Sequence, residues 1–176
     1  MQLDDYIVAC ICEGSAEQAV MELLLDANNL IFDNEQLLNE KIIRTRSAKN
    51  FEQRYLRKGF DRKIIVLRIL DSRRSNFNLS KAYVDKISVI DIVTAPEIEM
   101  LVIFNEKKYN EFKKSNMKPS EFCKIKLKLS NIKNYDFVKE YFKDINNLIK
   151  SIIEYRRVSK IKDGEYTLFD LLKPLT

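Results

Sequence analysis

The chain has 176 residues, of which 45% are hydrophobic and 32% charged, a composition typical of a globular protein and not of a disordered one. It contains no histidine, which excludes histidine-based triads, zinc sites built on histidine and an imidazole general base. Its three glycines lie far apart in the sequence, which excludes glycine-rich phosphate loops and dinucleotide-binding turns.

The composition also bears on where the protein resides. No apolar run approaches the roughly 20 residues that cross a bilayer, and residues 1–5 lack the basic region of a secretory signal. The cysteines are three in number, and Cys10 and Cys12 lie inside an apolar run, so we expect buried thiols and no disulfide framework. We therefore expect a cytoplasmic protein that does not bind a membrane.

The first half of the chain predicts strands alternating with helices. Residues 6–12, YIVACIC, form a continuous apolar run of strand length. Ser15, followed three residues later by Gln18, predicts the capped start of a helix. Residues 41–45 have the character of a short strand, and residues 48–58 that of a helix.

The second half begins with another strand and becomes mainly helical. Residues 63–70, KIIVLRIL, predict a second buried strand, residues 79–86 a short helix, and residues 87–95 a third strand. Pro96 is expected at the first position of the following helix. Further on, apolar residues recur at steps of three or four, which predicts helices packed on a core: Phe137, Tyr141, Ile145, Leu148, Ile152 and Tyr155.

This order of elements predicts the fold class. Strands that are apolar throughout and alternate with helices indicate a three-layer, Rossmann-like α/β fold, with a mainly parallel sheet flanked by helices. No linker, repeat or low-complexity tract is evident, so we expect a single domain over residues 1–176. Residues 1–105 would form its α/β core, and residues 106–176 a helical, basic extension packed on that core.

Acidic residues follow each of the three predicted strands: Glu13, then Asp71, then Glu97 and Glu99. In a parallel sheet these carboxylates converge on one edge, where mutual repulsion raises their pKa values unless a cation neutralises them. Mg²⁺ is suited to this role, because it usually binds one or two protein carboxylates together with substrate phosphates. The pattern favours a Mg²⁺ or Mn²⁺ site that acts on phosphate groups.

Each of these acidic residues also has a purely structural interpretation. Glu13 and Glu17 would stabilise the positive end of a helix dipole. Asp71 would cap a turn, as Asp often does after a strand. Glu97 and Glu99 would be ordinary first-turn glutamates of a helix. The sequence alone leaves both interpretations open.

Basic residues exceed acidic ones by 31 to 26, and they gather in two stretches. Residues 106–134 contain nine lysines and three glutamates, and residues 44–58 contain a second group: Arg44, Arg46, Lys49, Arg54, Arg57 and Lys58. A polyanionic partner or ordinary solvated helix faces would both explain this pattern. For the first case, we expect phosphate or nucleic-acid contacts from Arg73, Arg74, Lys107, Lys108, Lys124 and Lys126.

The motifs around these acidic residues resemble those of TOPRIM domains. Glu13-Gly14 at the end of the first predicted strand, with Glu17 in the helix that follows, is similar to the family's first motif. Asp71 is similar to the first aspartate of its second motif, and residues 95–101 resemble a later segment in which a proline precedes a glutamate. Topoisomerases, primases, OLD-type nucleases and the RloB-like proteins of bacterial defence and restriction loci share this module.

The resemblance covers about residues 5–105 and departs from the family at one position. Arg73 stands where the second aspartate of the second motif belongs, two residues after Asp71. Either Glu97 or Glu99 supplies the missing metal ligand, or the site has lost the metal and kept phosphate binding.

The resemblance implies a Mg²⁺-dependent nuclease or related phosphodiesterase that acts on nucleic acid in phage defence or restriction. It implies Glu13, Asp71 and Glu99 as metal ligands and Arg73 as a phosphate contact. Glu17 would act as a base, or would contact the ligands without binding the metal. The first alternative is a nucleic-acid-binding module without catalysis. The second is a protein-interaction module whose C-terminal helices bind a second copy or a partner subunit. The tail EYTLFDLLKPLT would either serve that contact or fold back on the core.

Overall fold

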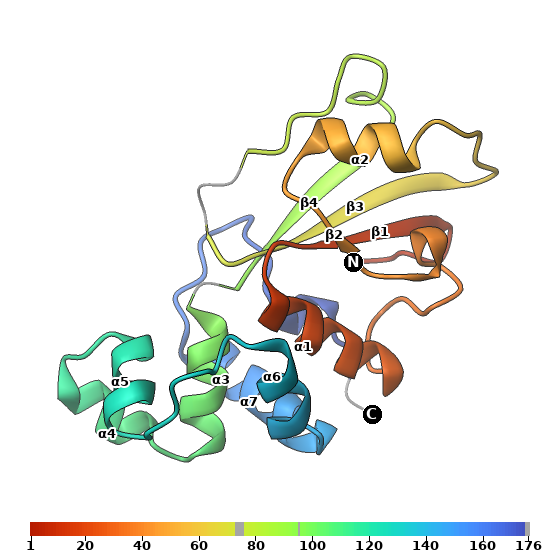
Figure 1. The fold of residues 1–176 in the computed structure, drawn as a ribbon. Helices are drawn as coiled ribbons and strands as arrows, with labels where there is room; N and C mark the ends of the chain where they lie inside the picture. The colour runs from red at the N-terminus through yellow and green to blue at the C-terminus, as the bar shows by residue number, and fades with distance from the viewer. Residues whose placement is uncertain (73–75, 95, 175–176) are drawn as a thin grey trace.

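A computed structural model of the chain describes residues 1–72, 76–94 and 96–174. Its centre is a sheet of four parallel strands in the order β2-β1-β3-β4 (Figure 1). The strands are β1 (Tyr6–Cys12), β2 (Ile43–Arg44), β3 (Lys63–Leu70) and β4 (Ser88–Val93). The predicted parallel sheet is therefore confirmed.

Helices flank this sheet and make up most of the second half of the chain. They are α1 (Ser15–Asp26), α2 (Ala48–Tyr55), α3 (Glu97–Asn105), α4 (Tyr109–Ser115), α5 (Pro119–Ile125), α6 (Tyr135–Tyr141) and α7 (Ile145–Val158). Two short 3-10 helices, η1 (Leu38–Glu40) and η2 (Leu168–Leu171), complete the elements.

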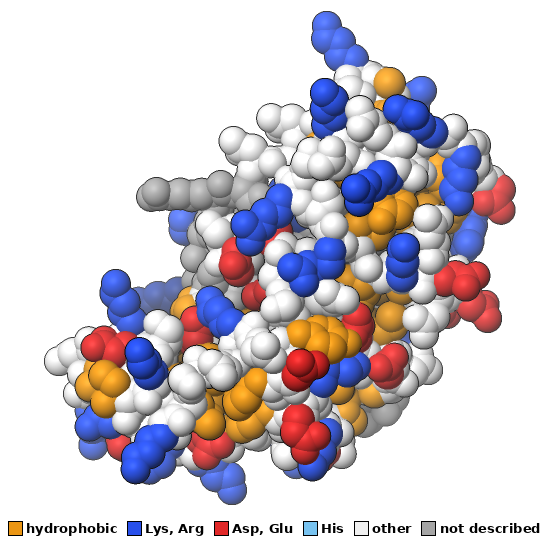
Figure 2. All heavy atoms as spheres, in the orientation of Figure 1, with side chains coloured by type: hydrophobic (Ala, Val, Ile, Leu, Met, Phe, Trp, Pro, Cys, Tyr) orange, Lys and Arg blue, Asp and Glu red, His pale blue; other side chains and the backbone are white. Residues whose placement is uncertain are grey.

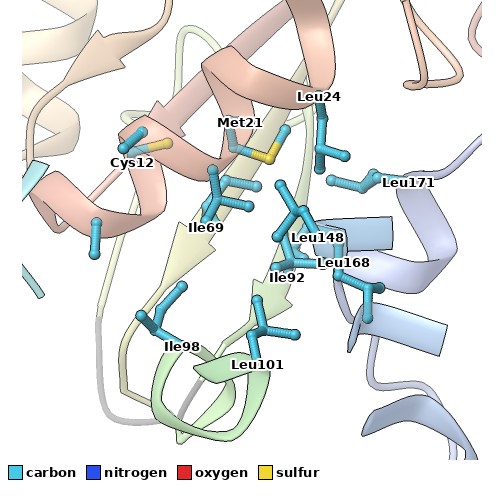
Figure 3. Close-up of a cluster of buried hydrophobic side chains, with 14 of the residues drawn as sticks. Cys12, Met21, Leu24, Ile69, Ile92, Ile98, Leu101, Leu148, Leu168 and Leu171 are labelled. Atoms are coloured by element: carbon cyan, nitrogen blue, oxygen red, sulfur yellow. The ribbon is translucent and has the colours of Figure 1, made fainter. Parts of the chain in front are cut away.

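Apolar side chains pack on both faces of the sheet, which gives three layers. The larger cluster lies between the sheet and α1, α3, α7 and η2; Figure 3 shows Met21 and Leu24 of α1 and Leu101 of α3 converging on Ile69 and Ile92 of the strands. The smaller cluster lies on the other face, between the sheet and α2 with the 76–87 segment. The three-layer α/β fold predicted from the sequence is confirmed.

The chain changes its winding direction between β1 and β3. The connection from β1 to β2 runs through α1 on one face, and the connection from β2 to β3 runs through α2 on the other. Strands β1 and β3 are neighbours, with Cys12 beside Ile69, so the reversal occurs between their carboxyl ends. Open parallel sheets bind ligands in the crevice at such a reversal.

Three local predictions were wrong. Pro96 is the N-cap of α3 and not its first helical residue, which is Glu97. Residues 79–86 form hydrogen-bonded turns and no helix, because the segment is fixed to α2 by side-chain contacts: Ser80 N donates to Glu52 Oε1 over 2.6 Å, and the Tyr83 hydroxyl donates to Leu56 O over 2.9 Å. Ser15 is not the N-cap of α1; that position is Gly14, and the Ser15 hydroxyl instead donates to Lys133 O over 3.1 Å.

The apolar stripe over residues 137–155 belongs to two helices, because Asp144 caps the start of α7 by accepting from Asn146 N at 3.0 Å. Helix α6 packs on α1, and α7 packs on α3 and η2. Across residues 137–172, all of which the structure describes, Tyr166 is the one exposed large hydrophobic side chain. The stripe and the tail therefore pack on the core, with Leu168 and Leu171 fully buried.

None of the helices in the described part of the chain has the length and apolar character needed to cross a bilayer. Cys10, Cys12 and Cys123 are free thiols and buried, as expected.

Candidate carboxylate site at the sheet edge

Glu17 lies at the winding reversal, in the first turn of α1, and only 3% of its surface is exposed. Its carboxylate folds back over Gly14, so closely that a Cβ atom at Gly14 would be 1.9 Å from Glu17 Oε2. The small residue in the Glu-Gly pair therefore makes room for a buried carboxylate. This role of glycine is steric, because the backbone at Gly14 is extended, with φ −106° and ψ 163°.

Two further carboxylates lie near Glu17. Asp71 is half-buried directly after β3, and Glu99 is buried in the first turn of α3. Burial raises the pKa of Glu17, and the negative charges of Asp71 and Glu99 raise it further. Its own backbone N–H and the charge of Lys133 act in the opposite direction. The net result is a buried acid that holds its proton more tightly than an exposed one.

Lys133 connects this cluster to the helical part of the protein. Its Nζ lies 3.1 Å from Glu99 Oε1, and half of its side chain is exposed. The segment between α5 and α6 crosses α3 to reach the start of α1 (Figure 1). Lys133 thus places a solvent-accessible cation beside the carboxylates. We call Glu17, Asp71, Glu99 and Lys133 the edge cluster.

Glu13 lies apart from the edge cluster, on the face of the sheet that α2 covers. Its Oε1 is 3.3 Å from Arg68 Nη2, and Arg68 Nη1 is 3.0 Å from Asp91 Oδ1. The Arg68 guanidinium also stacks 4.8 Å from the centre of the Phe77 ring. Glu13 is therefore one member of an ion-pair network that links β1, β3 and β4, buried at Glu13 and Arg68 and open to solvent at Asp91.

The structure does not bring all predicted metal ligands together. Within the described ranges, no three acidic or thiol side chains are grouped so that they could hold a metal ion. The backbone of Glu97 opens α3, but its side chain lies outside the described part of the structure, as do Arg73 and Arg74.

The four predicted phosphate-binding lysines surround α4 and α5. Lys107 and Lys108 lie between α3 and α4, and Lys108 forms an ion pair with Glu111 over 2.8 Å. Lys124 and Lys126 are exposed at the end of α5. Figure 1 shows α4 and α5 away from the sheet, beyond α3.

The sequence analysis missed two residues that shape this region. Arg68 is the single charged residue between Ile64 and Leu70, and a charge inside an otherwise apolar strand was a signal that it needs a buried partner. Lys133 gave no comparable signal, because it is one of nine lysines in its stretch and its partner Glu99 belongs to another helix.

No family model, no curated protein and no solved structure matches this chain. The arguments for function therefore come from the residues and their geometry.

The contact between Gly14 and Glu17 leads to a testable coupling. We expect Gly14→Ala to retain the fold, because alanine readily adopts the backbone angles of Gly14, but to displace the Glu17 carboxylate. In a Glu17→Ala background the added methyl group meets no carboxylate. A double-mutant cycle measured by urea denaturation should therefore give a coupling of about 1 kcal/mol. Additivity within about 0.3 kcal/mol would show that the two residues do not interact.

Proposed function

We propose that this protein is a divalent-cation-dependent phosphodiesterase that acts on nucleic acid, with the edge cluster as its active site. The observation that supports this most is the position of buried Glu17 near Asp71 and Glu99 at the winding reversal. A buried carboxylate whose pKa is raised by two neighbouring carboxylates, at the winding reversal of a parallel sheet, is what a cation-binding or acid–base site requires. The resemblance to TOPRIM nucleases of bacterial defence loci points to the same chemistry.

The donor atoms of the edge cluster suit Mg²⁺ or Mn²⁺. Its three acidic residues offer carboxylate oxygens, the hard ligands that such ions prefer. Asp71 and Glu99 would bind the ion. Mg²⁺ usually binds one or two protein carboxylates and completes its coordination shell with water and substrate phosphate. A bound cation would offset the negative charge of the scissile phosphate.

The remaining residues of the cluster have complementary roles in this proposal. Glu17, with its raised pKa, would accept a proton from the attacking water, because a base is most effective when its pKa is closer to the working pH. Lys133, half-exposed beside Glu99, would move from that carboxylate to a phosphate oxygen of the substrate. Glu13 would support the site from the opposite face through Arg68.

A magnesium titration of the purified protein tests this proposal. We expect calorimetry or amide NMR to detect Mg²⁺ binding at millimolar or lower concentration. The Asp71→Asn substitution should abolish that binding. Asp61→Asn is the matched control, because Asp61 is an exposed aspartate in the α2–β3 loop at the amino end of β3. Equal binding by wild type and Asp71→Asn would exclude Asp71 as a ligand.

A second candidate is a nucleic-acid-binding module that works without a metal. It is favoured by the ion pair between Lys133 and Glu99, which already offsets one buried carboxylate with a cation of the chain itself. This alternative predicts that nucleic-acid binding is the same in Mg²⁺ and in EDTA, and that no cleavage products form in either.

A further inference from the structure

Two stretches of the chain are strongly positive: residues 106–134, whose nine lysines and three glutamates give +6, and the residues around α2. Residues 44–59 contain six basic residues and one acidic residue, so their formal net charge is +5, the same as that of the whole chain. Since the chain has 31 basic and 26 acidic residues, the remainder holds 25 of each. The six basic residues are Arg44, Arg46, Lys49, Arg54, Arg57 and Lys58, and we call them the α2 cations.

All six are exposed, and those of the helix share one face. Residues Lys49, Asn50, Gln53, Arg54 and Arg57 form the solvent side of α2 and its continuation, while Ala48, Phe51 and Leu56 are buried on the sheet side. The solvent side thus presents three cations and two amides, without a carboxylate. Such a surface is suited to phosphate oxygens, which accept hydrogen bonds from both kinds of group.

The α2 cations have no carboxylate partners among the described residues. In the ranges that the structure describes, none of them forms an ion pair with a carboxylate; Arg44 donates to the amide oxygen of Gln18 over 3.2 Å, and Lys58 to that of Asn39 over 3.1 Å. The one acidic residue among them, Glu52, accepts a hydrogen bond from Ser80 N. Their charge is therefore available to a partner.

The lysines of residues 107–133 differ in their arrangement, because they are spread over α4, α5 and the loops beside them. Lys108 and Lys133 each pair with a glutamate, while the other seven, like the α2 cations, form no ion pair within the described residues. Figure 2 shows the contrast: acidic and basic side chains alternate at the lower left, over α4 and α5, whereas Lys and Arg predominate in the upper part, over α2.

The α2 cations also lead towards the proposed active site. Arg44 ends β2 at the carboxyl edge of the sheet, and it donates to Gln18, the residue that follows Glu17 in α1. Helix α2 then runs back towards the amino ends of the strands (Figure 1). Its eight residues extend about 12 Å, which matches three to four nucleotide steps of about 3.4 Å.

We infer that the α2 cations bind the phosphate backbone of nucleic acid and guide it to the edge cluster. The identity of the polyanion rests on the proposed function. The interaction itself does not require catalysis. It is electrostatic and depends weakly on base sequence. It weakens as the salt concentration rises, because binding then gains less from the release of counterions. We place the backbone-binding surface at α2 because Arg44 joins it to α1 beside the edge cluster, whereas α4 and α5 lie away from the sheet, beyond α3.

The test compares two variants of equal charge change in EDTA, where cleavage cannot occur. Lys49→Gln/Arg54→Gln/Arg57→Gln removes three α2 cations, and Lys107→Gln/Lys124→Gln/Lys126→Gln removes three exposed lysines near α4 and α5. Binding to fluorescein-labelled 20-nucleotide DNA, single-stranded and duplex, is followed by anisotropy between 50 and 200 mM salt. Circular dichroism and thermal unfolding verify that both variants retain the fold.

We expect the α2 variant to lose affinity on the order of 100-fold at 50 mM salt, and the slope of log K against log salt on duplex to fall by about 2.7. The α4/α5 variant should bind within about threefold of wild type. A third variant, Arg54→Lys/Arg57→Lys, keeps the charge and should also bind nearly as wild type, which separates charge from packing.

Three results would overturn the inference: loss of binding in the α4/α5 variant with retention in the α2 variant, no binding of wild type to either DNA, or binding of wild type to vesicles containing phosphatidylserine with none to DNA. A different result would contradict the proposed catalytic function but leave this inference intact. In that case the α2 variant still loses DNA binding, but Mg²⁺ neither binds nor supports cleavage.

Discussion

An Arg68→Met variant is expected to lose about 3–5 kcal/mol of its free energy of unfolding. Methionine keeps most of the apolar contact that Arg68 makes within β3, so packing changes little. The ion pair with Glu13 is lost, however, and Glu13 is 7% exposed. A buried carboxylate that loses a cationic partner loses part of the interaction that offsets its desolvation. Urea denaturation at pH 7 measures the difference.

Two further variants test whether the lost stability comes from the loss of this ion pair. Glu13→Gln/Arg68→Met removes both charges and should recover most of the lost stability, because replacing both partners of a buried pair is far less costly than removing one. Lys63→Met changes an exposed basic residue at the start of the same strand and should alter stability by less than about 0.5 kcal/mol. If Arg68→Met unfolds within 1 kcal/mol of wild type, the network does not stabilise the sheet.

Glu17→Gln should abolish most of the proposed activity and make the protein more stable at neutral pH. Loss of the base is expected to lower cleavage by about 100-fold or more. The stability effect follows from the raised pKa of Glu17: the folded state binds the proton more tightly than the unfolded state does. Ionising Glu17 therefore costs folding free energy, and stability falls as the pH rises from about 4.5 through the raised pKa.

Glutamine has no such titration. The melting temperature of Glu17→Gln should therefore equal that of wild type near pH 4 and exceed it at pH 7, and calorimetric scans at both pH values measure the gap. Glu35→Gln is the matched control, since Glu35 is exposed and lies outside the edge cluster. Wild-type cleavage by Glu17→Gln would exclude Glu17 as the base. A gap that widens towards acid pH would contradict the direction of its pKa shift.

The sequence was sufficient to predict the layers of the fold, because β1 is apolar throughout, β3 is apolar except for Lys63 and Arg68, and each leads to an acidic residue at the carboxyl edge. It was not sufficient to predict on which face of the sheet each acidic residue lies. Glu13 and Glu17 are four positions apart, yet one lies on the α2 face of the sheet and the other on the α1 face. That division depends on the pleat of β1 at the point where the strand ends, which apolar runs do not reveal.

Partners remote in sequence were also unpredictable. Glu13 pairs with Arg68, 55 residues away, because the register between β1 and β3 brings Ile11 beside Arg68. The 79–86 segment illustrates the same limit: its local pattern suggested a helix, but contacts with Glu52 and Leu56 of the α2 region hold it in turns. In each case a long-range contact determines the local outcome.

The segment after α7 joins two parts of the protein that are distant in sequence. Val93 N donates to Tyr166 O, Ile31 N to Leu171 O, and Lys173 N to Asn29 O. During synthesis the ribosome would therefore release the whole sheet before the segment that closes its larger core is available. Nascent chains shorter than about 170 residues should expose apolar surface along α1 and β4, and would be substrates for chaperones until residues 166–173 emerge.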